Sequence, residues 1–191
     1  MYFPTLLISL LPLASSLPLE SRQFLPTGQT VKQDVINIHN AVLALDATVQ
    51  AFQGSPLPTS LVDGTPVLLG VAEIHRVNRA GLRHAVAALP FSVEDSRQVV
   101  DAVVSTVNVS IPNATKNLKA KADAFKEGGL TLVVIASLNL LLYDHDTFSA
   151  ATLLKTNPRI GEAKTKEGAD AVANIHNVIV DAILFYGGSL V

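Results

Sequence analysis

The sequence contains no cysteine and no tryptophan, and only 5% of its residues are aromatic. Without cysteine the chain has no disulfide framework, no thiol nucleophile and no cysteine-ligated zinc or iron–sulfur site. A chain of 191 residues is nevertheless long enough to bury an apolar core without disulfides. Charge is scarce as well, because the formal net charge is only −2. Bulk charge therefore gives no reason to expect nucleic acid or an anionic membrane as a partner.

The N-terminal stretch is apolar but too short to cross a membrane. Tyr2 to Leu13 is followed by the small residues Ala14-Ser15-Ser16, which is the pattern of a secretory signal peptide. A membrane span needs about 20 residues, so we expect no transmembrane segment here. The sequence predicts a signal peptide over 1–16, a flexible arm or pro-segment over 17–29, and one domain over 30–191. The protein is therefore expected to be secreted.

Between Thr30 and Phe52 the apolar residues follow the period of an amphipathic helix. Thr30 and Gln33 have the spacing of a capping box, and Gly54 supplies the end. A second, shorter strip lies on roughly the opposite side of this helix, so the helix is either packed on both sides or leaves one strip available for a hydrophobic partner. The main strip is Val31, Val35, Ile38, Val42, Leu45, Val49 and Phe52, and the opposite strip is Ile36, Leu43 and Ala47.

The rest of the chain also has helical periodicity, interrupted by glycine and proline. Helices are expected from Thr65 to Leu89, from Ser92 to Gly128 with a break or kink at Pro112, and from Ile160 to Tyr186. The segment from Leu130 to Tyr143 is apolar around its whole circumference, which predicts a helix in the middle of a bundle. The sequence thus predicts an all-α fold, a single-domain up-down bundle of about five helices.

Sequence motifs of catalytic and cofactor sites are absent. The chain has no nucleophile elbow, no His-Glu-x-x-His, no phosphate loop and no dinucleotide fingerprint, so we expect no enzyme, no cofactor and no resident metal. Asp144-His145-Asp146 offers metal-ligand types, but consecutive helical residues point about 100° apart, which favours a polar helix end in water. His39 and His176 lie in a repeated Asn-Ile-His-Asn and form either a paired site or two histidines in contact with water.

Two amides and two sequons complete the set of candidate residues. Asn78 and Asn139 fall on apolar helix faces, where each side chain must bond another helix or the polar head of a ligand. Asn108 and Asn113 each begin an Asn-x-Ser/Thr sequon beside Pro112, which predicts glycosylation of an exposed segment.

Several of these segments together resemble the fungal hydrophobic surface-binding protein A family, which also contains cell-wall galactomannoproteins. The resemblance lies in Val35–Val42 continuing to Ala51–Gly54, in Val107–Phe125 with its Ile111-Pro112, and in Ile183–Tyr186. It implies that the chain adsorbs to hydrophobic solids and recruits an esterase, as some members do, or encloses a fatty acid in a helical bundle, as mannoprotein members do.

We therefore expect a secreted, non-catalytic protein, free or loosely associated with a cell wall, that binds a hydrophobic surface and recruits a secreted hydrolase. The alternative is a soluble carrier of a fatty acid or another lipid. Either role would use apolar side chains of the first and fourth helices, because burial of apolar area drives both kinds of binding. The candidate binding residues are Ile36, Val42, Leu43, Leu45, Val49, Phe52, Asn78, Leu138, Asn139 and Leu142.

Overall fold

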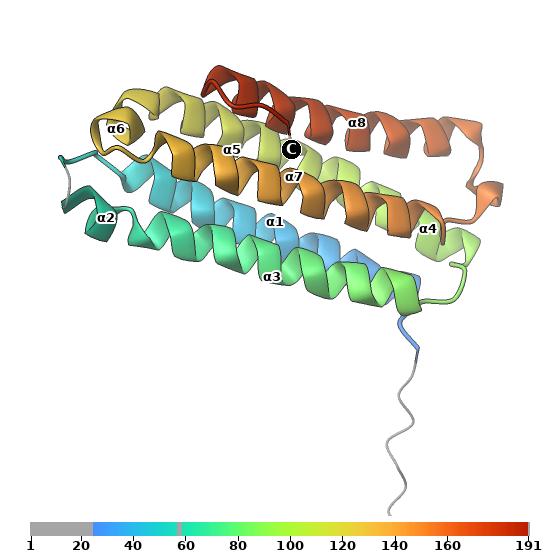
Figure 1. Ribbon diagram of the computed structural model, residues 1–191. Helices are drawn as coiled ribbons and strands as arrows, with labels where there is room; N and C mark the ends of the chain where they lie inside the picture. The colour runs from blue at the N-terminus through green and yellow to red at the C-terminus, as the bar shows by residue number, and fades with distance from the viewer. Residues whose placement is uncertain (1–24, 57–58, 191) are drawn as a thin grey trace, which may run out of the picture.

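The computed structural model describes residues 25–56 and 59–190, and these residues form helices and turns without a β-strand. The expected signal peptide, 1–16, and residues 17–24 of the expected arm lie outside the described residues. The predicted all-α bundle is confirmed (Figure 1). Its elements are α1 (Gly28–Ala51), α2 (Thr59–Asp63), α3 (Thr65–Ala87), α4 (Val93–Ala102), η1 (Val103–Val107), α5 (Asn108–Ala120), α6 (Ala122–Glu127), α7 (Thr131–Leu153), η2 (Pro158–Ile160) and α8 (Glu162–Phe185).

Helix α1 begins earlier than the sequence pattern indicated. Its N-cap is Thr27, whose hydroxyl accepts the Thr30 N–H at 3.4 Å, while the Thr30 hydroxyl accepts the Thr27 N–H at 3.2 Å. The expected capping box of Thr30 with Gln33 is therefore wrong, because the same motif lies one turn upstream. Gly28 and Gln29, expected in the arm, belong to the helix.

The third rod of the bundle consists of α4, η1 and α5 in continuous succession. Pro112 lies inside α5 without ending it, so the expected break does not occur there. The irregularity lies upstream, where Val103–Val107 forms a π-helical turn. A π-helical turn is a local irregularity at which a helix can bend. The chain thus keeps one long rod, and of the two expectations at Pro112, a break or a kink, the break is wrong.

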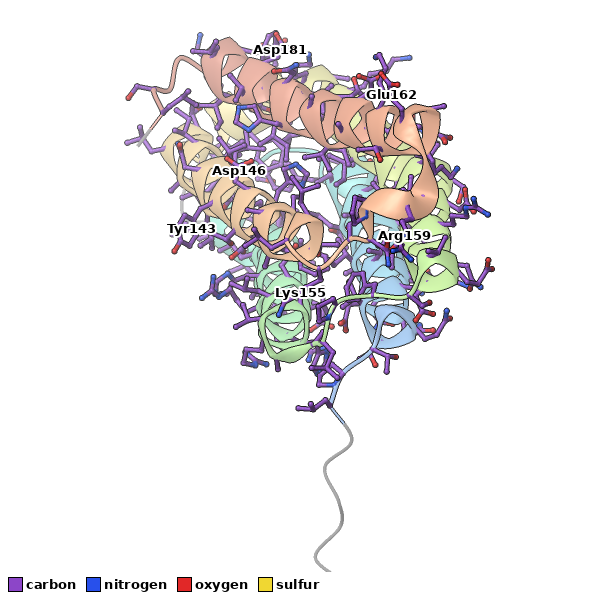
Figure 2. All side chains as sticks on the ribbon, turned by 90° about the vertical axis from the view of Figure 1, so that its right-hand side faces the viewer. Tyr143, Asp146, Lys155, Arg159, Glu162 and Asp181 are labelled. Carbon is purple, nitrogen blue, oxygen red and sulfur yellow. The ribbon has the colours of Figure 1, made fainter. Side chains whose placement is uncertain are left out.

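The long helices α1, α3, α7 and α8 and the rod α4–η1–α5 form a closed ring. In ring order, α1 packs against α3, α3 against α7, α7 against α8, α8 against the rod, and the rod against α1. Successive rods run in opposite directions along the chain (Figure 1), and the end view in Figure 2 shows them around a common centre. Chain order and ring order differ, because α3 and α7 lie side by side and run parallel.

Helix α7 is a wall of this ring, so its predicted place in the middle of the bundle is wrong. Val134 and Leu138 point inward and are 6% exposed, whereas Leu132 is 79% exposed and Tyr143 59%. Figure 2 shows Tyr143 directed away from the bundle. The all-round apolar pattern has two separate causes, an inner face turned to the ring's centre and an outer apolar face left in solvent.

Helix α8 is the one described helix with the length and composition of a membrane span. In this fold it is an amphipathic wall, since Ile175, Ile179 and Ile183 are buried toward α5 and α7. Its outer face carries charged residues, including Lys166 and Asp170, which pair with each other at 2.6 Å. Packing against its neighbours thus accounts for its inner apolar stripe, whereas Leu184 and Phe185 near its end are exposed.

Candidate ligand cavity

The centre of the ring is a cavity of about 710 Å³. Each rod contributes apolar side chains to its wall: Ile38 from α1, Ile74 from α3, Val103 from η1, Leu138 from α7 and Ile179 from α8. This volume lies within the range of about 300–1,000 Å³ that is usual for small-molecule sites. An apolar cavity of this kind excludes water unless polar groups line it, so the position of its few polar groups determines what it can hold.

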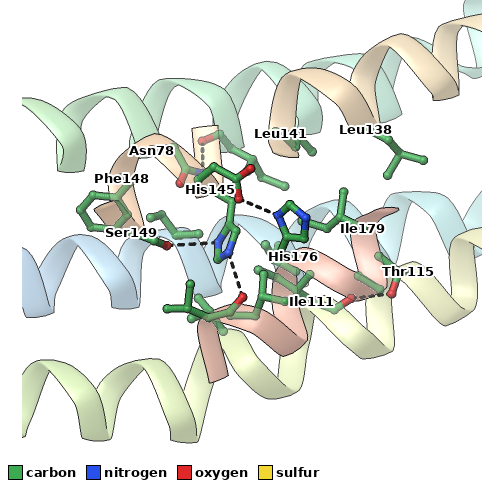
Figure 3. Close-up of a pocket in the computed structure, with 18 of the residues that line it drawn as sticks. Asn78, Ile111, Thr115, Leu138, Leu141, His145, Phe148, Ser149, His176 and Ile179 are labelled. Carbon is green, nitrogen blue, oxygen red and sulfur yellow. Dashed lines mark hydrogen bonds and ion pairs between the residues drawn. The ribbon is translucent and has the colours of Figure 1, made fainter. Parts of the chain in front are cut away.

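Several polar residues of the cavity wall lie on one stretch of α7. His145 points into the cavity, and its Nε2 donates to the Val172 carbonyl of α8 at 3.2 Å (Figure 3). Its Nδ1 lies 3.5 Å from the Ser149 hydroxyl, one turn further along α7. Burial lowers the pKa of His145, because the charged imidazolium is poorly solvated there. The ring is therefore neutral near pH 7 and keeps an acceptor at Nδ1.

On the α3 side of the cavity, Asn78 is buried. Its amide Nδ2 donates to the Ile74 carbonyl at 3.0 Å, a bond within α3 itself. The hydrogen bond required of a buried amide is thus made without a second helix. Figure 3 shows this side chain beside Phe148 and across from His145.

Three histidine–aspartate pairs join neighbouring helices of the ring. Asp34 of α1 accepts from His84 of α3 at 2.9 Å, and buried Asp144 of α7 accepts from His75 of α3 at 2.7 Å. Burial raises the pKa of both carboxyls, and the histidine partners partly counteract this effect. These pairs fix the register of α3 against both of its neighbours.

The third pair lies at the rim of the cavity. Asp146 of α7 accepts from Nδ1 of His176 of α8 at 2.9 Å, and both side chains are about half exposed. Beside the pair, the exposed residues Ala150 and Ala173 also line the cavity. Small side chains leave the α7–α8 seam thinly covered there, which makes this seam a candidate mouth of the cavity.

Five of the ten candidate binding residues line the cavity. They come from three helices that are separated in sequence, and the ring brings them to one common space. These residues are Val42, Leu45, Val49, Asn78 and Leu138.

The other five candidates lie elsewhere. Phe52 is buried and stacks on Phe125 with ring centroids 4.6 Å apart, and Leu142 is part of the packed core. Asn139 bonds the Ile135 and Ser189 carbonyls at 3.1 and 3.3 Å. Ile36 is half-buried, and Leu43 is 49% exposed on the outside of α1. The opposite strip of α1 therefore faces solvent and is not core.

Asp144-His145-Asp146 is not a polar helix end in water, because it lies in the middle of α7 and Asp144 is 1% exposed. As the helical geometry requires, the three side chains point to different places. Asp144 contacts α3, His145 faces the cavity, and Asp146 lies at the α7–α8 rim. The described residues hold no cluster of three metal-ligating side chains.

The two histidines of the repeated tetrapeptide also lie apart. His39 bonds Ser110 at 3.0 Å, whereas His176 bonds Asp146. Helices α1 and α8 are separated by the rod, so no paired-histidine site forms.

Both sequons lie within helix α5 and not in a loop. Asn113 is exposed, whereas Asn108 is half-buried and accepts a hydrogen bond from Asn174 of α8 at 2.8 Å. The residues that complete the sequons, Ser110 and Thr115, are buried.

Sequence reasoning missed the residues that give the cavity its polar end. His145, Ser149 and Thr152 recur at helical spacing on α7 and all line the cavity. A polar stripe along one side of a strongly apolar helix was the available signal, because such a stripe must face water or a lined cavity.

The fold and the site together define a hollow helical bundle, in which a ring of helices encloses an apolar cavity with a polar stretch on one wall. A family model described as hydrophobic surface binding protein A matches residues 28–153. The chain therefore belongs to the hydrophobic surface binding protein A family, and the predicted resemblance is confirmed. A search of curated proteins gave no match.

Solved structures with the same fold are distant in sequence. Afmp4p in complex with palmitic acid is 18% identical with a TM-score of 0.75, covering 83% of this chain and 99% of that one. Ligand binding domain 1 of Penicillium marneffei MP1 protein, complexed with arachidonic acids, is 20% identical with a TM-score of 0.73, covering 83% and 98%. Domain 2 of the same protein, complexed with multiple arachidonic acids, is 15% identical with a TM-score of 0.71, covering 82% and 94%.

Proposed function

We propose that this protein is a non-catalytic carrier that holds a long apolar molecule, of the size of a fatty acyl chain, inside the helical ring. The observation that carries the proposal is the cavity of about 710 Å³ with apolar walls from every rod. Burying an alkyl chain there gains about 0.8 kcal/mol per CH₂ removed from water. The fatty acids held by the similar structures support the same class of ligand for this chain.

The ligand is proposed to enter between α7 and α8. The Asp146–His176 pair and the small residues Ala150 and Ala173 border the cavity along this seam. Half-exposed ion pairs contribute little to stability, so separating Asp146 from His176 costs less than parting a seam packed with large apolar side chains.

Native mass spectrometry of the full secreted protein tests the carrier role. We expect a copurified mass of a few hundred daltons that disappears after unfolding and delipidation and returns when a fatty acid or alcohol is added. Leu141→Trp, which fills the cavity, should prevent the return. The matched control is Leu140→Trp, one residue earlier on the exposed face of α7, which should still take up ligand. A protein that gains no mass with any apolar ligand would refute the proposal.

Adsorption to hydrophobic surfaces is the second candidate function, favoured by the outer face of α7. Leu132, Leu140 and Tyr143 are all exposed there, so a row of apolar side chains is free to contact a wax or polyester. Recruitment of a secreted esterase to that surface belongs to this candidate and rests on the family resemblance alone.

Adsorption to polyester beads from dilute solution tests this second function. Leu132→Ser combined with Leu140→Ser should reduce the retained fraction, while Leu43→Ser on α1 is the matched control. Equal loss with both variants would assign adsorption to general hydrophobicity and would remove the role of α7.

We also propose that the protein acts outside the cell, free or loosely bound to the wall, with a glycan on Asn113. The signal-peptide pattern over 1–16 and the exposure of Asn113 support this location.

A further inference from the structure

Helices α3 and α7 present their outer sides as one elongated surface, because they run parallel and lie side by side (Figure 1). Exposed apolar side chains lie on it, and Leu69 of α3 is 65% exposed, much like Tyr143 of α7. Arg79 of α3 links the two helices, since its guanidinium carbon lies 5.9 Å from the centroid of the Tyr143 ring. We call this surface the α3–α7 face, with the members Leu69, Arg76, Arg79, Arg83, Leu132, Leu140 and Tyr143.

Three members of this face are arginines at helical spacing. Arg76, Arg79 and Arg83 are three and four residues apart, so they lie on the same side of α3. Arg76 pairs with Glu73 at 2.6 Å, whereas Arg79 and Arg83 form no ion pair among the residues that the structure describes. The face thus carries two guanidinium groups without a carboxylate partner.

Each acidic residue of α7 already has a histidine partner. Buried Asp144 accepts from His75, and Asp146 accepts from His176 at the rim with α8. Both lysines of α8, on another side of the ring, are paired with carboxylates. The pairs are Lys164 with Asp101 and Glu167, and Lys166 with Asp170. Unpaired positive charge and exposed apolar side chains therefore coincide on the α3–α7 face.

These features match the headgroup layer of an anionic phospholipid bilayer. Guanidinium groups bind phosphate oxygens in a planar, paired geometry. Arginine stems lie along apolar surface while their heads stay in the polar layer, and exposed leucine and tyrosine side chains enter the boundary with the acyl chains. Helix α7 also borders the candidate mouth with α8, so a bilayer at the α3–α7 face lies beside the opening of the cavity.

We infer that the α3–α7 face docks the protein onto anionic phospholipid bilayers, which supply or receive the apolar molecule held in the cavity. Arg79 and Arg83 contact lipid phosphates. Leu69, Leu132 and Tyr143 contact the acyl boundary. The inference rests on the proposed carrier function and names the lipid surface with which the carrier exchanges its ligand. It differs from adsorption to a wax or polyester, because it requires negative charge on the surface.

Co-sedimentation of the full secreted protein with lipid vesicles tests the inference. One set of vesicles is pure phosphatidylcholine, and the other replaces about one third of it with phosphatidylglycerol. We expect at least about tenfold tighter binding to the anionic vesicles, and loss of this preference at high salt. Equal binding to both sets, or binding to neither, overturns the inference. Uptake of a fatty acid from vesicle-free solution, followed by native mass spectrometry, reports on the carrier function separately.

Removal of the unpaired charges tests the assigned face. Arg79→Gln combined with Arg83→Gln should weaken binding to anionic vesicles about tenfold or more, because each basic residue near an anionic surface contributes about fivefold. The matched control is Arg97→Gln combined with Arg159→Gln, which removes the same charge from exposed positions outside α3 and α7. This control should weaken binding less than about twofold, because charges away from the bilayer are screened. Equal weakening assigns binding to net charge and overturns the inference. Arg83→Gln alone, at an exposed position, should cost about fivefold and replaces the double variant if that variant does not fold.

A fluorescent reporter tests which side of the ring meets the bilayer. The chain contains no tryptophan, so Leu69→Trp places a single fluorophore on the α3–α7 face and Leu43→Trp places one on the outside of α1. With anionic vesicles the emission of Leu69→Trp should shift to the blue, because the indole leaves water, while the emission of Leu43→Trp stays unchanged. Shifts of equal size, or a shift for Leu43→Trp alone, overturn the assigned face.

Discussion

The Asp144–His75 pair on the α3–α7 seam gives a quantitative test of how this ring is held together. Asp144 is 1% exposed, and one of its carboxylate oxygens accepts from His75 at 2.7 Å while the other has no partner among the described residues. His75→Ala removes the one hydrogen bond of a buried charge. Hydrogen bonds to charged groups contribute about 1.5–3 kcal/mol, so we expect a loss of about 2 kcal/mol. For a domain of this size that lowers Tm by about 4–8 °C.

The pH dependence of that loss identifies its cause. Burial raises the pKa of Asp144, so the folded state binds a proton more readily than the unfolded state, and stability falls as pH rises through the folded pKa. His75 counteracts this effect, and its removal raises the pKa of Asp144 further. The cost of His75→Ala should therefore be small near pH 4 and largest above pH 7.

Urea unfolding followed by circular dichroism at several pH values measures this cost directly. The control is His39→Ala, because His39 is also half-buried but bonds the neutral Ser110 hydroxyl at 3.0 Å. Its cost should not grow with pH. A loss for His75→Ala that is the same at pH 4.5 and pH 8, or no larger than that of His39→Ala, would refute the view that buried Asp144 depends on its histidine.

Three further predictions concern His145, Phe125 and the two sequons. Burial lowers the pKa of His145, so as pH falls below about 6.5 the unfolded chain takes up a proton before the folded protein does, and stability is lost. The drop in Tm between pH 7.5 and pH 5 should therefore be smaller in His145→Gln than in the parent protein. Phe125→Ala should cost about 3–5 kcal/mol in urea unfolding, because the ring is 1% exposed and stacks on Phe52, and a cost below 1 kcal/mol would contradict that packing. Asn113→Gln should remove a glycan mass from the secreted protein, whereas Asn108→Gln should leave the mass of the attached glycans unchanged.

The sequence was sufficient to predict the helices but not which helices pack against one another. The main strip of α1 is buried as expected, apart from half-buried Leu45, because helical periodicity records which side of a helix avoids water. Periodicity does not record what lies opposite, so α7 was expected at the centre although it forms a wall. An all-round apolar helix has the same pattern whether it is enclosed by protein or lies between a cavity and solvent.

The candidate site was predictable to a similar depth. Val42, Leu45, Val49 and Leu138 follow from apolar periodicity, since the inner strip of a wall helix faces the cavity. His145 could not be assigned in this way, because its role depends on the α8 carbonyl that takes its proton. Contacts between residues distant in the chain determine which polar side chains keep a free donor or acceptor.

The difference between chain order and ring order has a consequence for assembly. Helices α1 and α3 form one hairpin and α7 and α8 another, each from segments close in sequence, and these hairpins meet along α3 and α7. The rod α4–η1–α5 must then be seated between α1 and α8, far from its chain neighbours α3 and α7. The pairings of α3 with α7 and of the rod with α1 and α8 all join residues more than 60 apart in the chain, for example His75 with Asp144 and His39 with Ser110. Distant pairings of this kind form late in folding, because their loop entropy is paid before their contacts are gained. We therefore expect the two hairpins to form first and the ring to close afterwards, so that a newly made chain acquires its enclosed interior only in the final step of folding.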